Sequence, residues 1–123
     1  MTKHHDALRI LVVEDETLLA LDLSTMLEQL GHRVVGPASR LGDGLRLADA
    51  EPLDAALLDW NLNGVDSTRI AQRLIERQVP FALISGYAAH HFPSRLRNQP
   101  LLHKPYTLED LEKVLDGLQA GVG

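Results

Sequence analysis

Polar or charged side chains directly follow four short apolar runs of this sequence. Glu14-Asp15 follows Arg9–Val13, Asp59 follows Ala55–Leu58, Ser85 follows Phe81–Ile84, and Lys104 follows Leu101–His103. Carboxylates bind hard cations, and an ammonium group and a hydroxyl bind phosphoryl oxygens. If the fold brings these groups together, they predict a site for metal-assisted phosphoryl chemistry.

Three carboxylates in one pocket repel one another, so the site needs either raised pKa values or a bound cation. Mg²⁺ is the cation that these residues favour, since it takes oxygen ligands from one or two carboxylates, a carbonyl and several waters. Asp15, Asp59 and the backbone carbonyl of Asn61 are the predicted protein ligands. Lys104 and Ser85 would then hold the oxygens of a phosphoryl group on Asp59.

The apolar runs alternate with amphipathic segments, which predicts an open, doubly wound α/β fold with a parallel sheet of five strands. A further strand is expected at Val34-Val35, ended by Gly36-Pro37. In such sheets the ligand crevice lies at the carboxyl ends of the strands. Helices are expected over residues 16–30, 41–48 and 70–75, and a last one is opened by the capping residue Thr107 with Asp110 three positions later and continues to Leu118.

The connection between Ser85 and Lys104 has only eighteen residues and contains Pro93 and Pro100. Proline lacks a backbone N–H and interrupts a helix. The fourth helix is therefore predicted to be short, irregular or broken at Pro93.

Length and composition set limits on function. The 123 residues are expected to form one domain, 1–123, with its core at about residues 8–118. A net charge of -5 disfavours nonspecific nucleic-acid binding, and the absence of cysteine excludes disulfides and thiolate chemistry. Neither a signal peptide nor a membrane span is indicated, so the expected location is the cytoplasm. The six histidines are assigned no role.

These motifs, in this order, resemble the receiver domains of bacterial two-component response regulators over Arg9 to Leu118. The resemblance implies a flavodoxin-like strand order 2-1-3-4-5 and phosphoryl transfer from a phosphohistidine to Asp59. It implies self-catalysed chemistry without turnover of a metabolite, so the protein is not expected to be an enzyme. It also implies a cis peptide before Pro105, and a Mg²⁺ ion held by Asp15, Asp59 and the Asn61 carbonyl, with Glu14 acting directly or through water.

Two departures from the family pattern bear on its switch. Glu14 replaces the more usual Asp, and Leu101 stands where many receivers carry a Tyr or Phe that rotates inward on activation. The usual aromatic coupling is therefore not expected. Trp60 and Tyr87 either flank the mouth of the site or pack in the interior, and the sequence leaves both open.

The pattern Asp59–Gly64, with Phe81–Tyr87 and the interrupted fourth segment, looks like the small stand-alone receivers of alphaproteobacteria. Expected partners are a sensor histidine kinase, of the HWE type, or a histidine phosphotransfer protein, and a downstream protein reached in trans. The expected oligomeric state is a monomer or weak homodimer.

Two alternatives stay open. The first is a receiver-like module that binds partners without phosphorylation, which need not bind Mg²⁺. The second is a Toprim-like, metal-dependent nucleic-acid enzyme, in which the second acid would here be Asn61 and which gives Ser85 and Lys104 no role. Mg²⁺ titration tests the first alternative, and Mg²⁺-dependent cleavage of nucleic acid tests the second.

Overall fold

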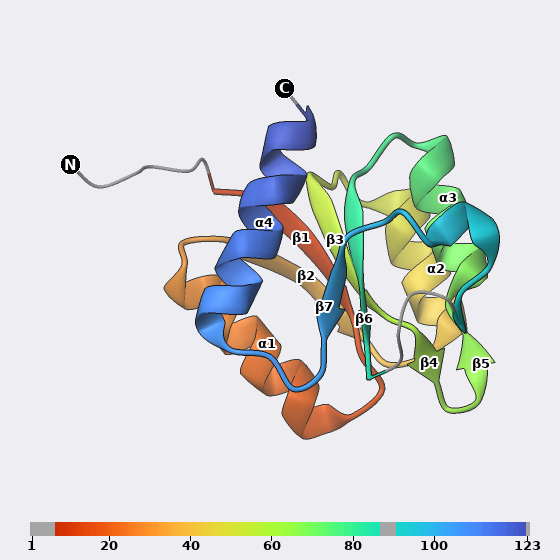
Figure 1. The fold of residues 1–123 in the computed structure, drawn as a ribbon, viewed down its shortest axis with the longest axis horizontal. Helices are drawn as coiled ribbons and strands as arrows, with labels where there is room; N and C mark the ends of the chain where they lie inside the picture. Colours follow the sequence, from red (N-terminus) through yellow and green to blue (C-terminus); the bar gives the residue numbers. More distant parts are fainter. Residues whose placement is uncertain (1–6, 87–90, 123) are drawn as a thin grey trace.

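A five-stranded parallel sheet forms the centre of the structure, with helices on both faces (Figure 1). The computed structural model describes residues 7–86 and 91–122. The strand order β2-β1-β3-β6-β7 is the doubly wound, flavodoxin-like order that the sequence predicts, so this prediction is confirmed. The strands of the sheet are β1 (Arg9–Val13), β2 (Arg33–Ala38), β3 (Ala55–Asp59), β6 (Phe81–Ser85) and β7 (Leu101–His103).

The two faces of the sheet build two hydrophobic layers. Successive residues of a strand point to opposite faces, and in β1 Leu11 joins one buried cluster while Ile10 and Val12 join the other. Helices α2 (Leu41–Ala50) and α3 (Thr68–Glu76) cover the first face. Helices α1 (Thr17–Gln29) and α4 (Leu108–Val122) cover the second. No helix within the described ranges is long and apolar enough to cross a membrane.

The start of α4 is set by the predicted cap. The Thr107 N–H donates to Asp110 Oδ2 at 2.9 Å, and the Asp110 N–H donates to Thr107 Oγ1 at 3.1 Å. This reciprocal pair satisfies backbone donors that have no partner within the helix.

The second strand is longer than predicted. Gly36-Pro37 was expected to end it, yet β2 continues to Ala38, which pairs with Val13 after a shift of register. Both Gly36-Pro37 and Lys104-Pro105 are cis, the latter as the family resemblance implied. Because β2 is an edge strand, a proline and an irregularity there cost no hydrogen bond to a further strand.

A small hairpin, which was not expected from the sequence, follows β3. Its strands are β4 (Asn61–Leu62) and β5 (Val65–Asp66), joined by Asn63 and Gly64 with φ of 54° and 87°. Asn-Gly is the residue pair that suits a two-residue turn with positive φ at both positions.

The connection between β6 and β7 is irregular, as predicted. Its described residues 91–100 contain the 3₁₀ turn η2 (Ser94–Leu96) and no α-helix. Phe92 and Leu96 are buried in the core and attach this segment to the sheet.

Candidate functional site

The carboxyl ends of four neighbouring strands meet at one open pocket of about 330 Å³. Since β1 pairs with β3, β3 with β6 and β6 with β7, the side chains that follow these strands converge. Of the six predicted site residues, five line the pocket; together with Glu16 and Gly86, the lining residues are Asp15, Asp59, Asn61, Ser85 and Lys104. Glu14, the sixth, lies beside them.

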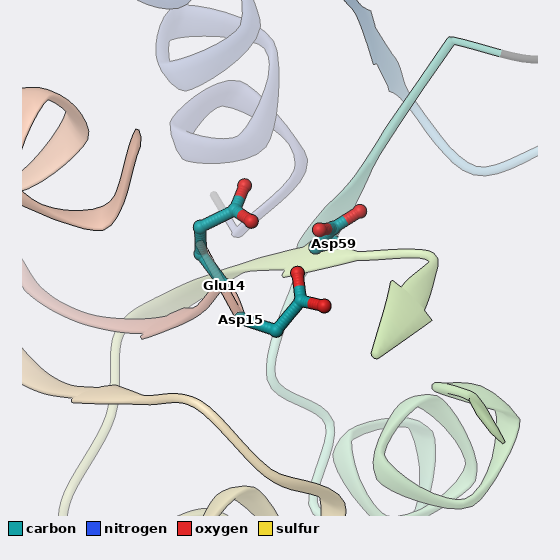
Figure 2. A group of neighbouring side chains, drawn as sticks. All are labelled: Glu14, Asp15 and Asp59. Atoms are coloured by element: carbon teal, nitrogen blue, oxygen red, sulfur yellow. The ribbon is translucent and has the colours of Figure 1, made fainter. Parts of the chain in front are cut away.

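Glu14, Asp15 and Asp59 form a compact acidic cluster (Figure 2). Each offers a carboxylate oxygen, and these oxygens all lie within 4.8 Å of one another. Glu14 is 1% exposed and Asp59 is 4% exposed, whereas Asp15 is half-buried. Two of the three charges are therefore taken out of water, which requires compensation from nearby cations.

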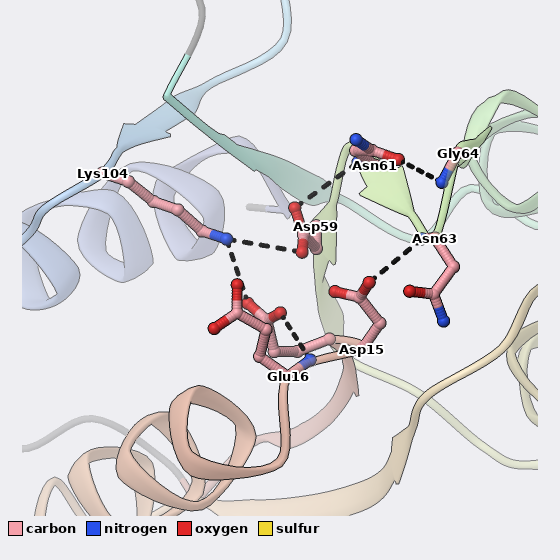
Figure 3. Close-up of polar contacts among 8 residues, drawn as sticks. Asp15, Glu16, Asp59, Asn61, Asn63, Gly64 and Lys104 are labelled. Carbon is pink, nitrogen blue, oxygen red and sulfur yellow. Dashed lines mark hydrogen bonds and ion pairs between the residues drawn. The ribbon is translucent and has the colours of Figure 1, made fainter.

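Lys104 supplies part of that compensation. Its Nζ lies 3.4 Å from Asp59 Oδ2 (Figure 3). It also lies 3.3 Å from Glu14 Oε1. Its backbone N–H donates to the Ser85 carbonyl at 2.9 Å, which continues the β6–β7 pairing up to the site. Burial lowers the pKa of Lys104, but the charges of Asp59 and Glu14 outweigh it and the net pKa is raised. The side chain is thus an ammonium ion at neutral pH.

The pKa of Asp59 is raised to about 7. Burial is the largest cause and the Glu14 carboxylate adds to it, while Lys104 and the Asn61 N–H act in the opposite direction. The Asn61 N–H is 3.4 Å from Asp59 Oδ1. One ammonium group does not neutralise two buried carboxylates, so a second cation would favour the charged form of Asp59.

Glu14 faces Lys104 more than the pocket. Its Oε2 accepts the Glu16 N–H at 3.1 Å. Its Oε1 is buried and, among the described residues, has no hydrogen-bond partner, although the Lys104 ammonium lies at ion-pair distance. Glu14 therefore contributes negative charge beside the pocket without lining it.

Asp15 is held by the turn of the β4–β5 hairpin. Its Oδ2 accepts the N–H of Asn63 at 3.0 Å, while the Asn61 side-chain oxygen accepts the N–H of Gly64 at 2.7 Å. Both contacts involve the β4–β5 hairpin (Figure 3). The hairpin thus uses the side chain of Asn61, the residue whose backbone carbonyl was predicted as a ligand.

The donor set fits Mg²⁺. Carboxylate oxygens from Asp15 and Asp59 converge beside a pocket that is open to water, and Mg²⁺ binds through one or two carboxylates while keeping several waters. The buried Glu14 Oε1 without a hydrogen bond adds to the unbalanced negative charge.

Ser85 and Gly86, at the end of β6, also line the pocket. Ser85 is buried and lines the pocket. A Cβ added to Gly86 would meet no atom within 4 Å, so there is open space beside the Ser85 position.

For Trp60 and Tyr87, the sequence left open whether each residue flanks the site or packs in the interior. Trp60 packs on Phe92, with ring centroids 4.9 Å apart, and joins the core under α2 and α3, which corresponds to the packing alternative. Tyr87 lies outside the described residues. Leu101 is partly buried against the same core and offers no ring at that position.

Three residues that line or support the site were not predicted from the sequence. Glu16 lines the pocket, Asn63 bonds Asp15, and Gly64 bonds Asn61. The Asn63-Gly64 dipeptide was a signal for the hairpin. No sequence signal predicted the contact of Asn63 with Asp15.

Known proteins share the sequence pattern and the fold of this chain. A sequence model of the family described as "response regulator receiver domain" matches residues 10–116. SdrG from Sphingomonas melonis Fr1 is 36% identical, with a TM-score of 0.83 over 94% of this chain and 99% of SdrG. A BeF3-activated conformation of SdrG is 37% identical, with a TM-score of 0.78 over 93% of this chain and 98% of that one.

Protein PilH of Pseudomonas aeruginosa is 32% identical over 120 residues, which are 92% of this chain and 98% of PilH. The transcriptional regulatory protein PdtaR of Mycobacterium tuberculosis is 26% identical over 107 residues. That match covers 84% of this chain and 52% of PdtaR. The chain therefore spans about half the length of PdtaR.

Proposed function

Because this chain belongs to the response regulator receiver domain family, we propose that it is a phosphoacceptor switch of a two-component or phosphorelay system. Asp59 accepts a phosphoryl group from a phosphohistidine in a reaction that requires Mg²⁺. The observation that carries the proposal is the position of Asp59, in the 330 Å³ pocket, 3.4 Å from the Lys104 ammonium and beside two further carboxylates.

In the transfer, an Asp59 oxygen forms a bond to phosphorus and the bond from phosphorus to the histidine nitrogen breaks, which returns the imidazole to the donor. A bound Mg²⁺ would supply positive charge for the phosphoryl oxygens, and Asp15, Asp59 and the Asn61 carbonyl would hold it. Asp59 reacts as the carboxylate, so its pKa of about 7 makes loss of its proton a condition of the reaction.

Lys104 and Ser85 then hold the new phosphoryl group. The Lys104 ammonium already lies beside Asp59 Oδ2, and an ammonium ion binds phosphoryl oxygens as a point charge. The Ser85 hydroxyl is a suitable donor on the β6 side of the pocket. Both residues would exchange contacts when Asp59 is modified, which changes the ends of β6 and β7.

The partners in this proposal are proteins. A sensor histidine kinase, of the HWE type, or a histidine phosphotransfer protein donates the phosphoryl group, and a downstream protein reads the modified state in the cytoplasm. The switch works as a monomer or weak homodimer, without nucleic acid.

Phosphorylation with acetyl phosphate tests the function directly. Intact-mass analysis should show one added phosphoryl group that requires Mg²⁺ and is absent in Asp59→Asn. Asp43→Asn, which changes an exposed carboxylate of α2, is the matched control and should react like the unmodified chain. The proposal fails if no adduct forms from acetyl phosphate or from a phosphorylated kinase, or if the adduct persists in Asp59→Asn.

A phosphorylation-independent interaction module is the second candidate. It is favoured by the Glu14 carboxylate facing Lys104 and by the absence of an aromatic ring at Leu101. Such a module would show no adduct in the same assay, and its site need not bind Mg²⁺.

A further inference from the structure

The tip of the β4–β5 hairpin touches the acidic cluster through the backbone. The Asn63 N–H donates to Asp15 Oδ2 at 3.0 Å, although the two residues are 48 positions apart in the chain. Asp15 is half-buried and extends toward Asp59 from the end of β1 (Figure 2). With one oxygen engaged by Asn63, its other oxygen is left for the pocket.

Side-chain packing contributes little to the conformation of this tip. The hairpin strands have two residues each. Leu62 is 3% exposed and anchors β4 to the core, but Val65 is 49% exposed. A Cβ at Gly64 would meet no atom within 4 Å, so the glycine is required by its φ of 87° and not by lack of space.

The Asn61 side chain holds the tip instead. Its Oδ1 accepts the Gly64 N–H at 2.7 Å across the turn (Figure 3). This bond closes the loop formed by Asn63 and Gly64, both of which have positive φ. The direction of the Asn63 N–H, and so its contact with Asp15, depends on that closure.

We infer that Asn61 is a positioning residue whose side-chain oxygen, by fixing the hairpin tip, orients the Asp15 carboxylate for a divalent cation. This role is separate from any ligand role of the Asn61 backbone carbonyl, because that carbonyl is present whatever side chain stands at position 61. The inference rests on the proposed function, because it concerns the Mg²⁺ that the function requires.

Asn61→Ala tests the inference, because it removes the acceptor and leaves the backbone carbonyl in place. Mg²⁺ alone is titrated without a phosphodonor, and binding is followed by calorimetry and by the emission of Trp60, the single tryptophan. Loss of one orienting hydrogen bond should weaken the Mg²⁺ affinity roughly 3- to 10-fold.

Three further variants sharpen the result. Asn61→Ser restores a neutral acceptor that serves in turns, and it should recover part of the affinity. Gly64→Ala disturbs the tip through its φ while keeping Asn61, and it should weaken Mg²⁺ binding as Asn61→Ala does. Asn98→Ala changes an exposed asparagine away from the site and should bind like the unmodified chain.

A second readout separates positioning from general stability. The amide proton signal of Asn63 in metal-free protein reports its bond to Asp15 and should shift in Asn61→Ala and Gly64→Ala but not in Asn98→Ala. Equal Mg²⁺ affinity in Asn61→Ala and the unmodified chain, or an unchanged Asn63 signal, overturns the inference and leaves the proposed function intact. Failure of the unmodified chain to bind Mg²⁺ overturns both.

Discussion

Three acidic side chains gather at the carboxyl edge of the sheet, and two of them pair with one ammonium group. Lys104 Nζ lies within 3.4 Å of Asp59 Oδ2 and within 3.3 Å of Glu14 Oε1, and Asp15 completes the cluster. The negative charge exceeds the positive charge in a pocket where two carboxylates are buried. Electrostatic repulsion is therefore stored in the metal-free site and is relieved by protonation or by a cation.

Asp59→Asn should stabilise the metal-free protein in a pH-dependent way. The pKa of Asp59 is raised from 3.8 to about 7, so the folded state binds a proton more tightly than the unfolded state. This carboxylate costs nothing below about pH 4, costs increasingly between about pH 4 and 7, and has its full cost above that range. The gain in unfolding free energy should rise to about 2–4 kcal/mol near pH 8.

Urea unfolding in the presence of a chelator measures this gain across the pH range. Asp22→Asn, which neutralises an exposed carboxylate of α1, is the matched control and should show no such pH dependence. A gain for Asp59→Asn that stays constant from about pH 4 to 8 would contradict the raised pKa.

Lys104→Met should destabilise the metal-free protein and strengthen Mg²⁺ binding. Methionine keeps a long side chain but leaves Glu14, which is 1% exposed, without its counter-charge. Because Lys104 is 26% exposed, the loss should be smaller than for a fully buried pair, about 1–3 kcal/mol at neutral pH. Lys113→Met, on the exposed face of α4, should change neither quantity. Weaker Mg²⁺ binding in Lys104→Met would show that the ammonium helps to hold the ion's ligands.

At the scale of elements, the β6–β7 connection is attached to the site through Trp60. Trp60 follows Asp59, its N–H donates to the Ile84 carbonyl at 2.9 Å, and its carbonyl accepts the Ser67 N–H at 3.0 Å. Its ring rests on Phe92, 4.9 Å between centroids. The β6–β7 connection, through Phe92, therefore contacts Trp60, the residue next to the proposed phosphoacceptor Asp59.

Phe92→Ala should destabilise the fold by about 3–5 kcal/mol, since a side chain that is 2% exposed is removed from a packed core. The emission of Trp60 should shift to longer wavelength because its ring loses an apolar neighbour. Denaturant unfolding measures the first effect and steady-state fluorescence the second. Leu108→Ala, at a leucine that is 40% exposed, is the control. An unchanged Trp60 spectrum in Phe92→Ala would show that the Trp60–Phe92 contact does not connect the β6–β7 segment to the site.

At the scale of the whole molecule, the net charge of -5 and the acidic pocket favour cations and disfavour nucleic acid. A ligand that binds only the folded state stabilises it by an amount that grows with its concentration. Mg²⁺ with beryllofluoride, at about 100 times its Kd, should add about 2.7 kcal/mol and raise the Tm by roughly 10 °C. Thermal unfolding should show no such rise in Asp59→Asn, and an equal rise there would place the ligand elsewhere.

The sequence by itself determined the order of the elements and which side chains end the strands. Buried runs such as Ala55–Leu58 and the change to helical periodicity are local signals. Right-handed crossovers then leave few topologies, so Asp59 and Lys104 had to share one edge of the sheet. The fold followed from these rules, and so did the presence of five of the six predicted site residues in the pocket and the cap at Thr107.

Only the tertiary structure decided which atoms meet. The continuation of β2 through Gly36-Pro37 depends on its place at the edge of the sheet. The pairing of Lys104 with both Glu14 and Asp59, and the contact of Asn63 with Asp15, join residues far apart in the chain at hydrogen-bond or ion-pair distance. Such contacts follow from strand register and turn geometry, which are set by packing across the whole domain and leave no periodic trace in the sequence.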